Sequence, residues 1–180
     1  MKTKKCKVCG DEFVQANSMQ KVCSVKCAVD LAMIEKEKKR KREWSKEKEE
    51  IIDRITTASQ WRNILQKLVN SYIRKRDQDK PCISCGKPLK GKFDAGHFYS
   101  VGSYPNLRYD EDNIWGQCVR CNRDLHGNLL EYRKNLEFRI GQERMQDLEA
   151  KRNLELKLSI PEIKDLIKVY KKKIKAFSNK

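Results

Sequence analysis

The eight cysteines of this 180-residue chain fall into four close pairs. Two, three, two and two residues separate the members of the pairs, which are Cys6 and Cys9, Cys23 and Cys27, Cys82 and Cys85, and Cys118 and Cys121. Cysteines this near in sequence are poor disulfide partners for each other, but a turn can aim both thiolates at one metal ion. The spacing therefore favours two four-cysteine structural zinc sites.

A secreted disulfide scaffold is the alternative for a chain so rich in cysteine. The first residues, MKTKKCKVCGDEF, lack the apolar segment of a signal peptide, and no stretch is long and apolar enough to span a bilayer. Reduced thiols that hold metal in a cytosol-like compartment fit better. We therefore expect a cytoplasmic protein without a membrane partner.

Charge and hydropathy limit the size of any single core. Hydrophobic residues make up 38% and charged residues 37% of the chain, and the net charge is +16. Small folded units joined by solvated helices are expected from this composition. The positive excess favours a polyanionic partner, because Lys and Arg contacts release the counterions condensed on nucleic acid. The simpler interpretation is a surface that keeps the protein soluble.

Composition divides the chain into four segments. Residues 1–30 predict a treble-clef-like or ribbon-type zinc finger, which needs the metal because so short a segment buries little surface. Residues 31–58 predict a charged helix, residues 59–151 the main domain with its packing helices, and residues 152–180 a basic carboxy-terminal helix. Helices are expected to begin at serine N-caps and to be interrupted at one glycine; these residues are Ser24, Ser59, Ser159 and Gly141.

Two basic runs are candidate contacts for the phosphates of DNA. The run in 31–58 is either a phosphate-binding ridge or the solvated face of a spacer helix, and the pattern favours neither. A second run makes one face of the last helix basic. The candidate residues are Lys38, Lys39, Arg40, Lys41, Arg42, Lys171, Lys172 and Lys173.

The two central cysteine pairs frame a strand, loop, strand and helix pattern. KFDAGHFY predicts a strand ending near His97, VGSYPNLRYDED a loop, NIWGQC a second strand, and VRCNRDLHGNLLEYR a helix. A closed site of four thiolates would pin the hairpin that carries His97 to the helix that begins near Cys121. The expected fold is α+β, with a small zinc-stapled ββα-metal core and long flanking helices.

This unit resembles the zinc-stapled branch of the HNH endonucleases over about residues 82–133. The family pattern is a His that ends the first strand, an Asn in the loop, and an Asn or His on the helix directly after CxxC, matched here by His97, Asn113 and Asn122. The resemblance implies that His97 takes a proton from water, that Asn113 orients the imidazole, and that Asn122 binds Mg²⁺ or Mn²⁺. Gly96 departs from the pattern, because an acid usually precedes the base.

The other ligands of the catalytic metal stay open. Asp94 could reach the metal only if the strand bends at residues 95–96, whereas His126 would share a helix face with Asn122. A His ligand would favour softer ions, so the choice of metal is open too. Simpler roles compete: a hydrogen-bonding partner for Asp94, a bystander for either histidine, and a turn residue or helix N-cap for Asn113 and Asn122.

Longer stretches resemble the NinG/Rap recombination endonucleases of lambdoid phages. They are RDQDKPCISCG, FDAGHF, LRYDEDNIWGQCVRCN and YRKNLEFRIGQERMQDLE, together with the first cysteine cluster and the charged helix behind it. The resemblance implies a nuclease for branched DNA such as D-loops and Holliday junctions, in the cytoplasm of a bacterial host. His97 would be catalytic, with Asp94, Asn113 and Asn122 around it. A homodimer is a hypothesis, because symmetric cutting of a four-way junction needs two active sites.

Two other functions compete with a nuclease. A non-catalytic zinc-finger DNA-binding or recombination-accessory protein would need the cysteine sites and the charge, but not Asp94, His97, Asn113 and Asn122. An RNA-binding zinc ribbon is the other, and the lack of aromatic-rich sheet motifs counts against it. Incubation with branched DNA, with and without a divalent ion, separates an enzyme from a binding protein.

Overall fold

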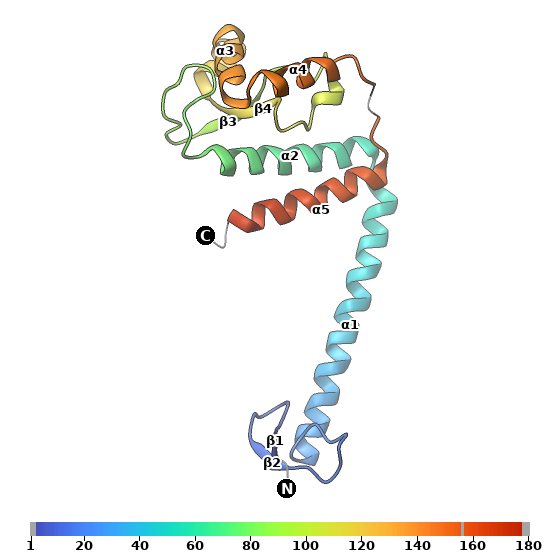
Figure 1. Cartoon of the computed structure of the whole chain (residues 1–180). Coiled ribbons are helices and arrows are strands. Elements are labelled where there is room, and N and C mark those ends of the chain that lie inside the picture. Colours follow the sequence, from blue (N-terminus) through green and yellow to red (C-terminus); the bar gives the residue numbers. More distant parts are fainter. Residues whose placement is uncertain (1–2, 156, 178–180) are drawn as a thin grey trace. The chain divides into compact units, whose positions relative to one another are not determined.

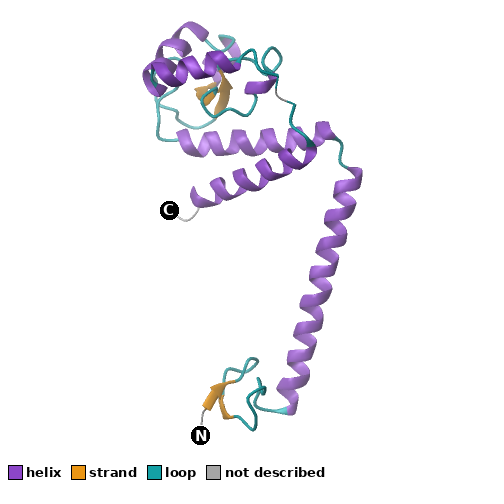
Figure 2. Ribbon diagram, turned by 45° about the vertical axis from the view of Figure 1, so that its right-hand side comes forward, coloured by secondary structure: helices purple, strands orange, loops and turns teal. Residues whose placement is uncertain are grey.

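The structure, a computed structural model, describes residues 3–155 and 157–177 and divides the chain into two units. The first unit ends at Thr56 and the second begins at Thr57. Each unit combines helices with a two-stranded sheet, so the chain is α+β as predicted (Figure 2). Among the described residues, no helix has both the length and the apolar character that crossing a membrane requires.

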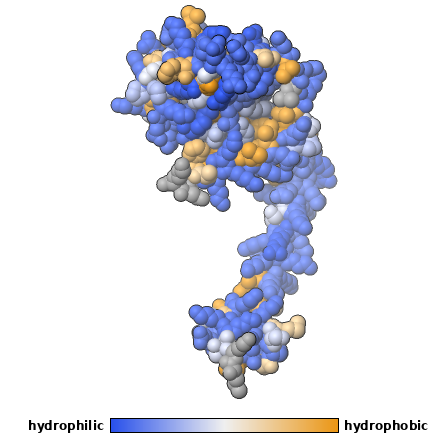
Figure 3. Space-filling model, in the orientation of Figure 1, coloured by the Kyte–Doolittle hydropathy of each residue, from blue (hydrophilic) through white to orange (hydrophobic). Residues whose placement is uncertain are grey.

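The first unit consists of a hairpin and one long helix. Strand β1 (Thr3–Lys5) pairs antiparallel with β2 (Glu12–Val14), and helix α1 spans Val25–Ile55. Ser24 caps α1 as predicted, because its side chain accepts the backbone N–H of Cys27. Cys27 is also the residue of α1 that is buried, and the face of α1 seen in Figure 3 is almost entirely hydrophilic.

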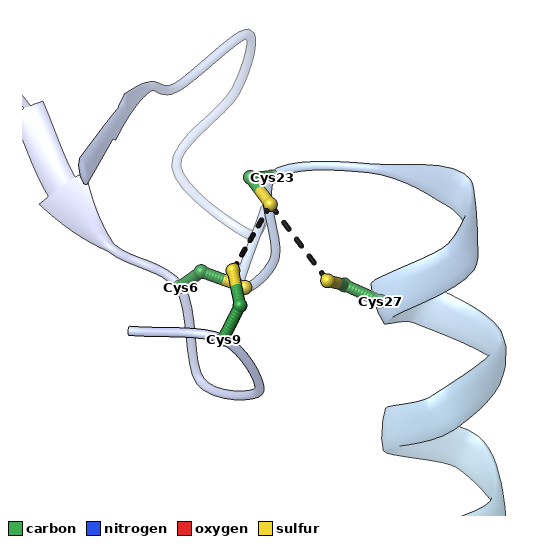
Figure 4. Close-up of side chains that lie close together, drawn as sticks. All are labelled: Cys6, Cys9, Cys23 and Cys27. Carbon is green, nitrogen blue, oxygen red and sulfur yellow. Dashed lines mark hydrogen bonds between the residues drawn. The ribbon is translucent and has the colours of Figure 1, made fainter. Parts of the chain in front are cut away.

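The four cysteines of the first unit converge from three places. Cys6 and Cys9 lie in the turn after β1, Cys23 precedes α1, and Cys27 stands in its first turn (Figure 4). All four sulfur atoms lie within 4.8 Å of one another, with Cys23 Sγ 3.4 Å from Cys9 Sγ and 3.8 Å from Cys27 Sγ. This cluster can hold a zinc ion, as the spacing predicts.

The second unit places helices on both faces of one hairpin. Strand β3 pairs antiparallel with β4, so that His97 lies opposite Ile114 and Phe93 opposite Cys118. Helix α2 covers one face, with α5 packed against α2, and α3 and α4 lie on the other face (Figure 1). The elements are α2 (Ala58–Asp77), β3 (Phe93–His97), the 3₁₀ turn η1 (Pro105–Leu107), β4 (Ile114–Cys118), the π-helical turn η2 (Arg120–Asp124), α3 (Leu129–Ile140), α4 (Gln142–Lys151) and α5 (Ile160–Phe177).

An apolar cluster fills each side of the hairpin. The cluster toward α2 and α5 contains Trp61, Leu65, Val69, Ile73, Ile114, Ile163, Ile167 and Tyr170. The cluster toward α3 and α4 contains Ile83, Phe98, Leu107, Trp115, Tyr132, Leu136, Ile140, Met145 and Leu148. The apolar stripe of the carboxy-terminal helix is therefore part of the core of the second unit, and only its other face is available to a partner.

A buried carboxylate fixes the end of α2 to the hairpin. Asp77 has no exposed surface and accepts two hydrogen bonds from Arg76 and one each from Lys80 and the backbone N–H of Gly116, all between 2.8 and 2.9 Å. Burial raises the pKa of Asp77, but the bonds and charge of Arg76 outweigh burial and leave this pKa below its ordinary value. Asp77 is therefore ionised and paired at neutral pH.

Local hydrogen bonds set the starts of two helices. The start of α2 differs from the sequence prediction, and the start of α5 agrees with it. Thr57, not Ser59, caps α2, because Thr57 Oγ1 accepts the N–H of Gln60 while Gln60 Oε1 accepts the N–H of Thr57. This reciprocal pair satisfies two backbone donors, which a cap at Ser59 would leave to water. Ser159 begins the last helix as predicted, and its N–H and hydroxyl both donate to Glu162.

The helix predicted after the second strand is broken. The π-helical turn η2 ends at Asp124, and the chain then makes a turn in which His126 and Asn128 have φ angles of 47° and 44°. Helix α3 starts only at Leu129, and Gly141 separates it from α4 as predicted. The ββα pattern therefore carries a short turn where a continuous helix was expected.

We predict that a chelator that strips zinc unfolds residues 3–24 but leaves α2 and α5 protected. In the first unit the buried hydrophobic residues among those described are Cys6 and Cys27, so a metal bound by the cysteines would supply most of its stability. Hydrogen exchange of the full-length protein, with and without chelator, measures this. Equal protection of residues 3–24 in both samples would show that the unit folds without metal.

Candidate active site

The central cysteines meet where the hairpin joins η2. Their sulfur atoms lie within 4.8 Å of one another, and the set is Cys82, Cys85, Cys118 and Cys121. The backbone N–H of Cys118 donates to Cys82 Sγ at 3.3 Å, and that of Cys121 to Cys118 Sγ at 3.4 Å. Burial raises the pKa of the Cys121 thiol to about 12, so the four thiols need a cation to become thiolates together. This set has the ligands of a closed structural zinc site.

His97 is the last residue of β3, and its ring is tied to the loop that follows. Its Nε2 lies 3.1 Å from the backbone carbonyl oxygen of Arg108. A carbonyl can only accept, so Nε2 carries the proton and Nδ1 keeps its lone pair. Burial lowers the pKa of His97 below its ordinary value of 6.5, and the charge of Arg108 lowers it further, against the effect of the carbonyl. The imidazole is therefore neutral at pH 7 and can accept a proton.

Asn113 acts on His97 through the loop between them. Its buried side chain accepts the N–H of Tyr99 at 2.7 Å and donates to the carbonyls of Tyr99 and Leu107, both at 3.0 Å. Leu107 immediately precedes Arg108, so Asn113 fixes the carbonyl that holds the ring of His97. The resemblance implied that Asn113 orients the imidazole; in the structure the side chain of Asn113 is connected to the ring through the carbonyls of this loop.

Asp94 and Asn122 meet on the other face of the hairpin. Asn122 Nδ2 donates to Asp94 Oδ2 at 3.1 Å. Arg123 Nε and Nη2 donate to the two carboxylate oxygens at 2.8 and 3.0 Å. The hydrogen bond from Arg123 lowers the pKa of Asp94 and outweighs burial, so the carboxylate is ionised. Sequence reasoning missed Arg123, whose one signal was its place directly after Asn122.

The strand does not bend to bring Asp94 toward His97. The residues of β3, from Phe93 to His97, pair with β4 in one continuous register. Asp94 and His97 are three residues apart on this strand, so their side chains leave opposite faces. The bend at residues 95–96, on which a shared metal site depended, is absent from the strand.

Gln117 fills the space that a side chain at position 96 would need, so this position takes a glycine. A Cβ atom at Gly96 would lie 2.1 Å from Gln117 Oε1. Gln117 is fully buried and donates from Nε2 to Ser84 Oγ at 2.6 Å and to the carbonyl of Gly127 at 2.5 Å, so it cannot move aside cheaply. The position that carries an acid in the HNH pattern is closed to one here.

His126 is not on a helix face shared with Asn122. It is exposed in the turn after η2, where it lines a shallow groove together with His97. Other walls of this groove are Phe98, Tyr99, Ser100, Tyr104, Leu129, Leu130 and Arg133. The predicted metal ligands Asp94, Asn122 and His126 are therefore divided between two places. Among the described residues, the groups of three or more neighbouring Cys, His, Asp or Glu ligands are the two cysteine clusters.

The basic residues predicted to bind DNA differ in their exposure and in whether their charges are already paired. The residues from Lys38 to Arg42 lie on α1, where Lys39, Arg40 and Lys41 form exposed ion pairs with glutamates of the same helix. Lys171 and Lys172 are exposed on α5. Lys173, in contrast, bonds to Glu111 at 2.5 Å and lies over the rings of Tyr72 and Tyr170. Lys173 thus contributes to packing within the second unit.

We predict that Asn113→Asp destabilises the second unit by about 2–4 kcal/mol, because it turns two donors into acceptors that face buried carbonyls. Asn63→Asp, at an exposed position of α2, is the matched control and should change the free energy of unfolding by less than about 0.5 kcal/mol. Urea denaturation followed by circular dichroism measures both. A variant at Asn113 as stable as the control would remove the role assigned to this side chain.

Comparison with known proteins connects this architecture to one family. Residues 1–180 match the family model described as the bacteriophage lambda NinG protein. Protein ninG of Escherichia phage 933W is 37% identical over 190 residues, which cover 98% of this chain and 94% of the relative. Protein ninG of Escherichia phage lambda is 42% identical over 121 residues, 67% of this chain and 59% of the relative. No solved structure matches. The chain belongs to the NinG family of bacteriophage proteins.

Proposed function

We propose that this protein is a DNA endonuclease that hydrolyses phosphodiesters in branched recombination intermediates, with His97 as the general base. The observation that carries the proposal is the state of His97. Its ring is neutral and held through Nε2 by the carbonyl of Arg108, while Nδ1 makes no hydrogen bond to the described residues. A ring fixed at one nitrogen and available at the other, in the wall of a groove, suits proton transfer from water.

The chemical step needs few groups. Nδ1 of His97 takes a proton from a water molecule, whose oxygen forms a bond to phosphorus as the bond to the leaving sugar oxygen breaks. Negative charge grows on the phosphate oxygens during this exchange, and a cation must balance it. Arg133 lines the same groove as His97, where its half-exposed guanidinium pairs with Glu149 at 2.7 Å. Because ion pairs near the surface are weak, this guanidinium can exchange Glu149 for a phosphate.

Asp94 and Asn122 have the chemistry of a site for Mg²⁺ or Mn²⁺. An ionised carboxylate and a side-chain amide lie side by side, and these ions prefer oxygen ligands. Asn122 would have to turn its Oδ1 toward the ion, because its Nδ2 faces Asp94 in the structure. Because Asp94 and His97 leave opposite faces of β3, such an ion would not share the groove of His97 and would bind the DNA backbone beside the phosphate that is cut. Arg123 now occupies the carboxylate, but this pair is at the surface, where ion pairs are weak. The guanidinium can therefore give way and turn to a phosphate instead.

Branched DNA is the partner that the charge and the family resemblance support. The net charge is +16, and exposed lysines and arginines stand on α1 and on the outer face of α5. Contacts of this kind bind the phosphate backbone without reading sequence, which suits an enzyme directed by the shape of its substrate. Zinc in both cysteine clusters, action in the host cytoplasm and a homodimer on four-way junctions complete the proposal.

We predict that His97→Ala lowers the rate of cleavage of branched DNA by about 10²–10⁴-fold while binding changes little, because only proton transfer is lost. His126→Ala, the matched control in the same groove, should lose far less. Cleavage is followed on a four-way junction with Mg²⁺ or Mn²⁺, and binding without either. Equal cleavage by wild type and His97→Ala would reject this mechanism, and a wild type that binds but never cuts would favour a non-catalytic DNA-binding protein.

We predict that the acid limb of the pH–rate profile has its midpoint below pH 6.5. Burial and the charge of Arg108 lower the pKa of His97 below 6.5, so the neutral base persists as the pH falls to values at which an exposed histidine would be protonated. The measurement is kcat/KM on branched DNA against pH at constant ionic strength. A midpoint clearly above 6.5 would assign the base to another group.

A further inference from the structure

An arginine-lined cavity of about 620 Å³ borders the same loop that holds His97. Its walls come from the start of α2, from the loop around η1, and from the chain between α4 and α5. Arg62, Arg108 and Arg152 line it, one from each of these three places. Much of the remaining wall is apolar and includes Pro105, Tyr109, Leu154, Leu158 and Ile163. Positive charge and apolar surface therefore face one space.

Neutral partners hold two of the three guanidinium groups in place. Arg108 Nε donates to Gln66 Oε1 at 2.8 Å. Arg152 Nη2 donates to the hydroxyl of Tyr104 at 3.1 Å, and its guanidinium lies 5.0 and 5.1 Å from the ring centres of Tyr99 and Tyr104. Because amide and phenol groups orient a guanidinium without cancelling its charge, both arginines remain able to bind an anion.

The positive charge of the cavity is not neutralised from within. Among the described residues, no carboxylate forms an ion pair with any of its three arginines, unlike Arg123, which Asp94 neutralises. The acid in the cavity wall, Glu155, pairs with Lys157 at 2.7 Å. The buried Nε of Arg152 also lacks a hydrogen-bond partner. Fixed positive charge without a carboxylate partner suits an anionic ligand.

We infer that this cavity binds one nucleotide of an unpaired DNA strand, with its phosphate on the arginines and its base against the apolar wall. The inference rests on the proposed function and names the part of the branched substrate that the protein recognises. A free phosphate would use the arginines but leave the apolar wall in water. A duplex keeps its bases stacked, so an unpaired strand is the DNA that can offer both a phosphate and an open base.

Arg108 connects the cavity to the candidate base. Its backbone carbonyl accepts the Nε2–H of His97, while its side chain lines the cavity. Tyr104 makes a second connection, because it lines the groove of His97 and bonds to Arg152. A nucleotide held by the arginines therefore lies across this loop from the groove. Cleavage would fall close to the point where a strand leaves its duplex.

Substitution of the arginines tests the inference through binding alone. Fluorescence anisotropy compares a forked DNA with two single-stranded arms and a blunt duplex of equal length, without Mg²⁺ or Mn²⁺. Arg62→Ala is the clean variant, because Arg62 is exposed and accepts the hydroxyl of Tyr109 through its backbone carbonyl, which the substitution keeps. Arg152→Ala removes an anchored guanidinium. Arg74→Ala, on the exposed surface at the other end of α2, removes the same charge outside the cavity.

Each cavity variant is expected to bind the fork about tenfold more weakly, as the loss of a charged hydrogen bond predicts, and the duplex within about twofold of wild type. The slope of log K against log salt should fall by about one on the fork. Arg74→Ala should affect both DNAs alike and slightly. Equal losses on fork and duplex, or equal losses for Arg62→Ala and Arg74→Ala, would overturn the inference and leave a general electrostatic surface.

Failure of the proposed function has a different signature. A wild-type protein that binds the fork selectively, loses that selectivity in the Arg62 and Arg152 variants, and yet never cuts DNA would support the cavity and reject the nuclease. A wild type in which His97 is needed for cleavage, but whose cavity variants bind the fork normally, would support the nuclease and reject the cavity. A wild type that binds neither DNA rejects both.

Discussion

Four thiols at the base of the β3–β4 hairpin are the contact on which the candidate site depends. They join the turn before β3, the last residue of β4 and the turn η2, and they can do so as thiolates only around a cation. Two five-residue strands are not stable alone in water. The cysteine cluster at one end, and Asp77 bound to Gly116 in the middle, give this hairpin the rigidity that a positioned histidine requires.

On this scaffold, one loop carries most of the proposed chemistry. The segment between β3 and β4 leaves the sheet at His97, is fixed from within by Asn113, and returns the carbonyl of Arg108 to the ring it started from. The groove of His97 and the arginine cavity both border this loop. Binding and catalytic groups commonly lie on loops that a rigid scaffold holds in place. A few contacts set the conformation of such a loop, and these contacts are independent of the packing of the core.

The sequence predicted what depends on local chemistry. Cysteine spacing gave both four-thiol clusters, and serine caps gave the starts of α1 and α5. It missed the cap at Thr57, although the reciprocal partner Gln60 is only three residues away. It failed where distant residues decide: the carbonyl of Gly127, bonded to Ser84 and Gln117, accompanies the turn that ends η2 before His126. The bond from His97 to a backbone carbonyl has no side-chain signature, so no motif could have revealed Arg108. The side-chain set His97, Asn113, Asp94 and Asn122 was identifiable, but its division over two faces was not.

The contact between Gly96 and Gln117 links two positions that lie on neighbouring strands. Because one side chain fills the space of the other, neither position can change alone: a larger residue at Gly96 requires a smaller one at Gln117. Ser84 Oγ would then lose its donor, and the carbonyl of Gly127 would keep only the hydroxyl of Ser84. Three sites must therefore be altered together before an acid can stand next to His97. Among related chains, positions 84, 96 and 117 should vary as one block or not at all, and the absence of that acid is a property inherited with the whole hairpin rather than a single exchangeable residue.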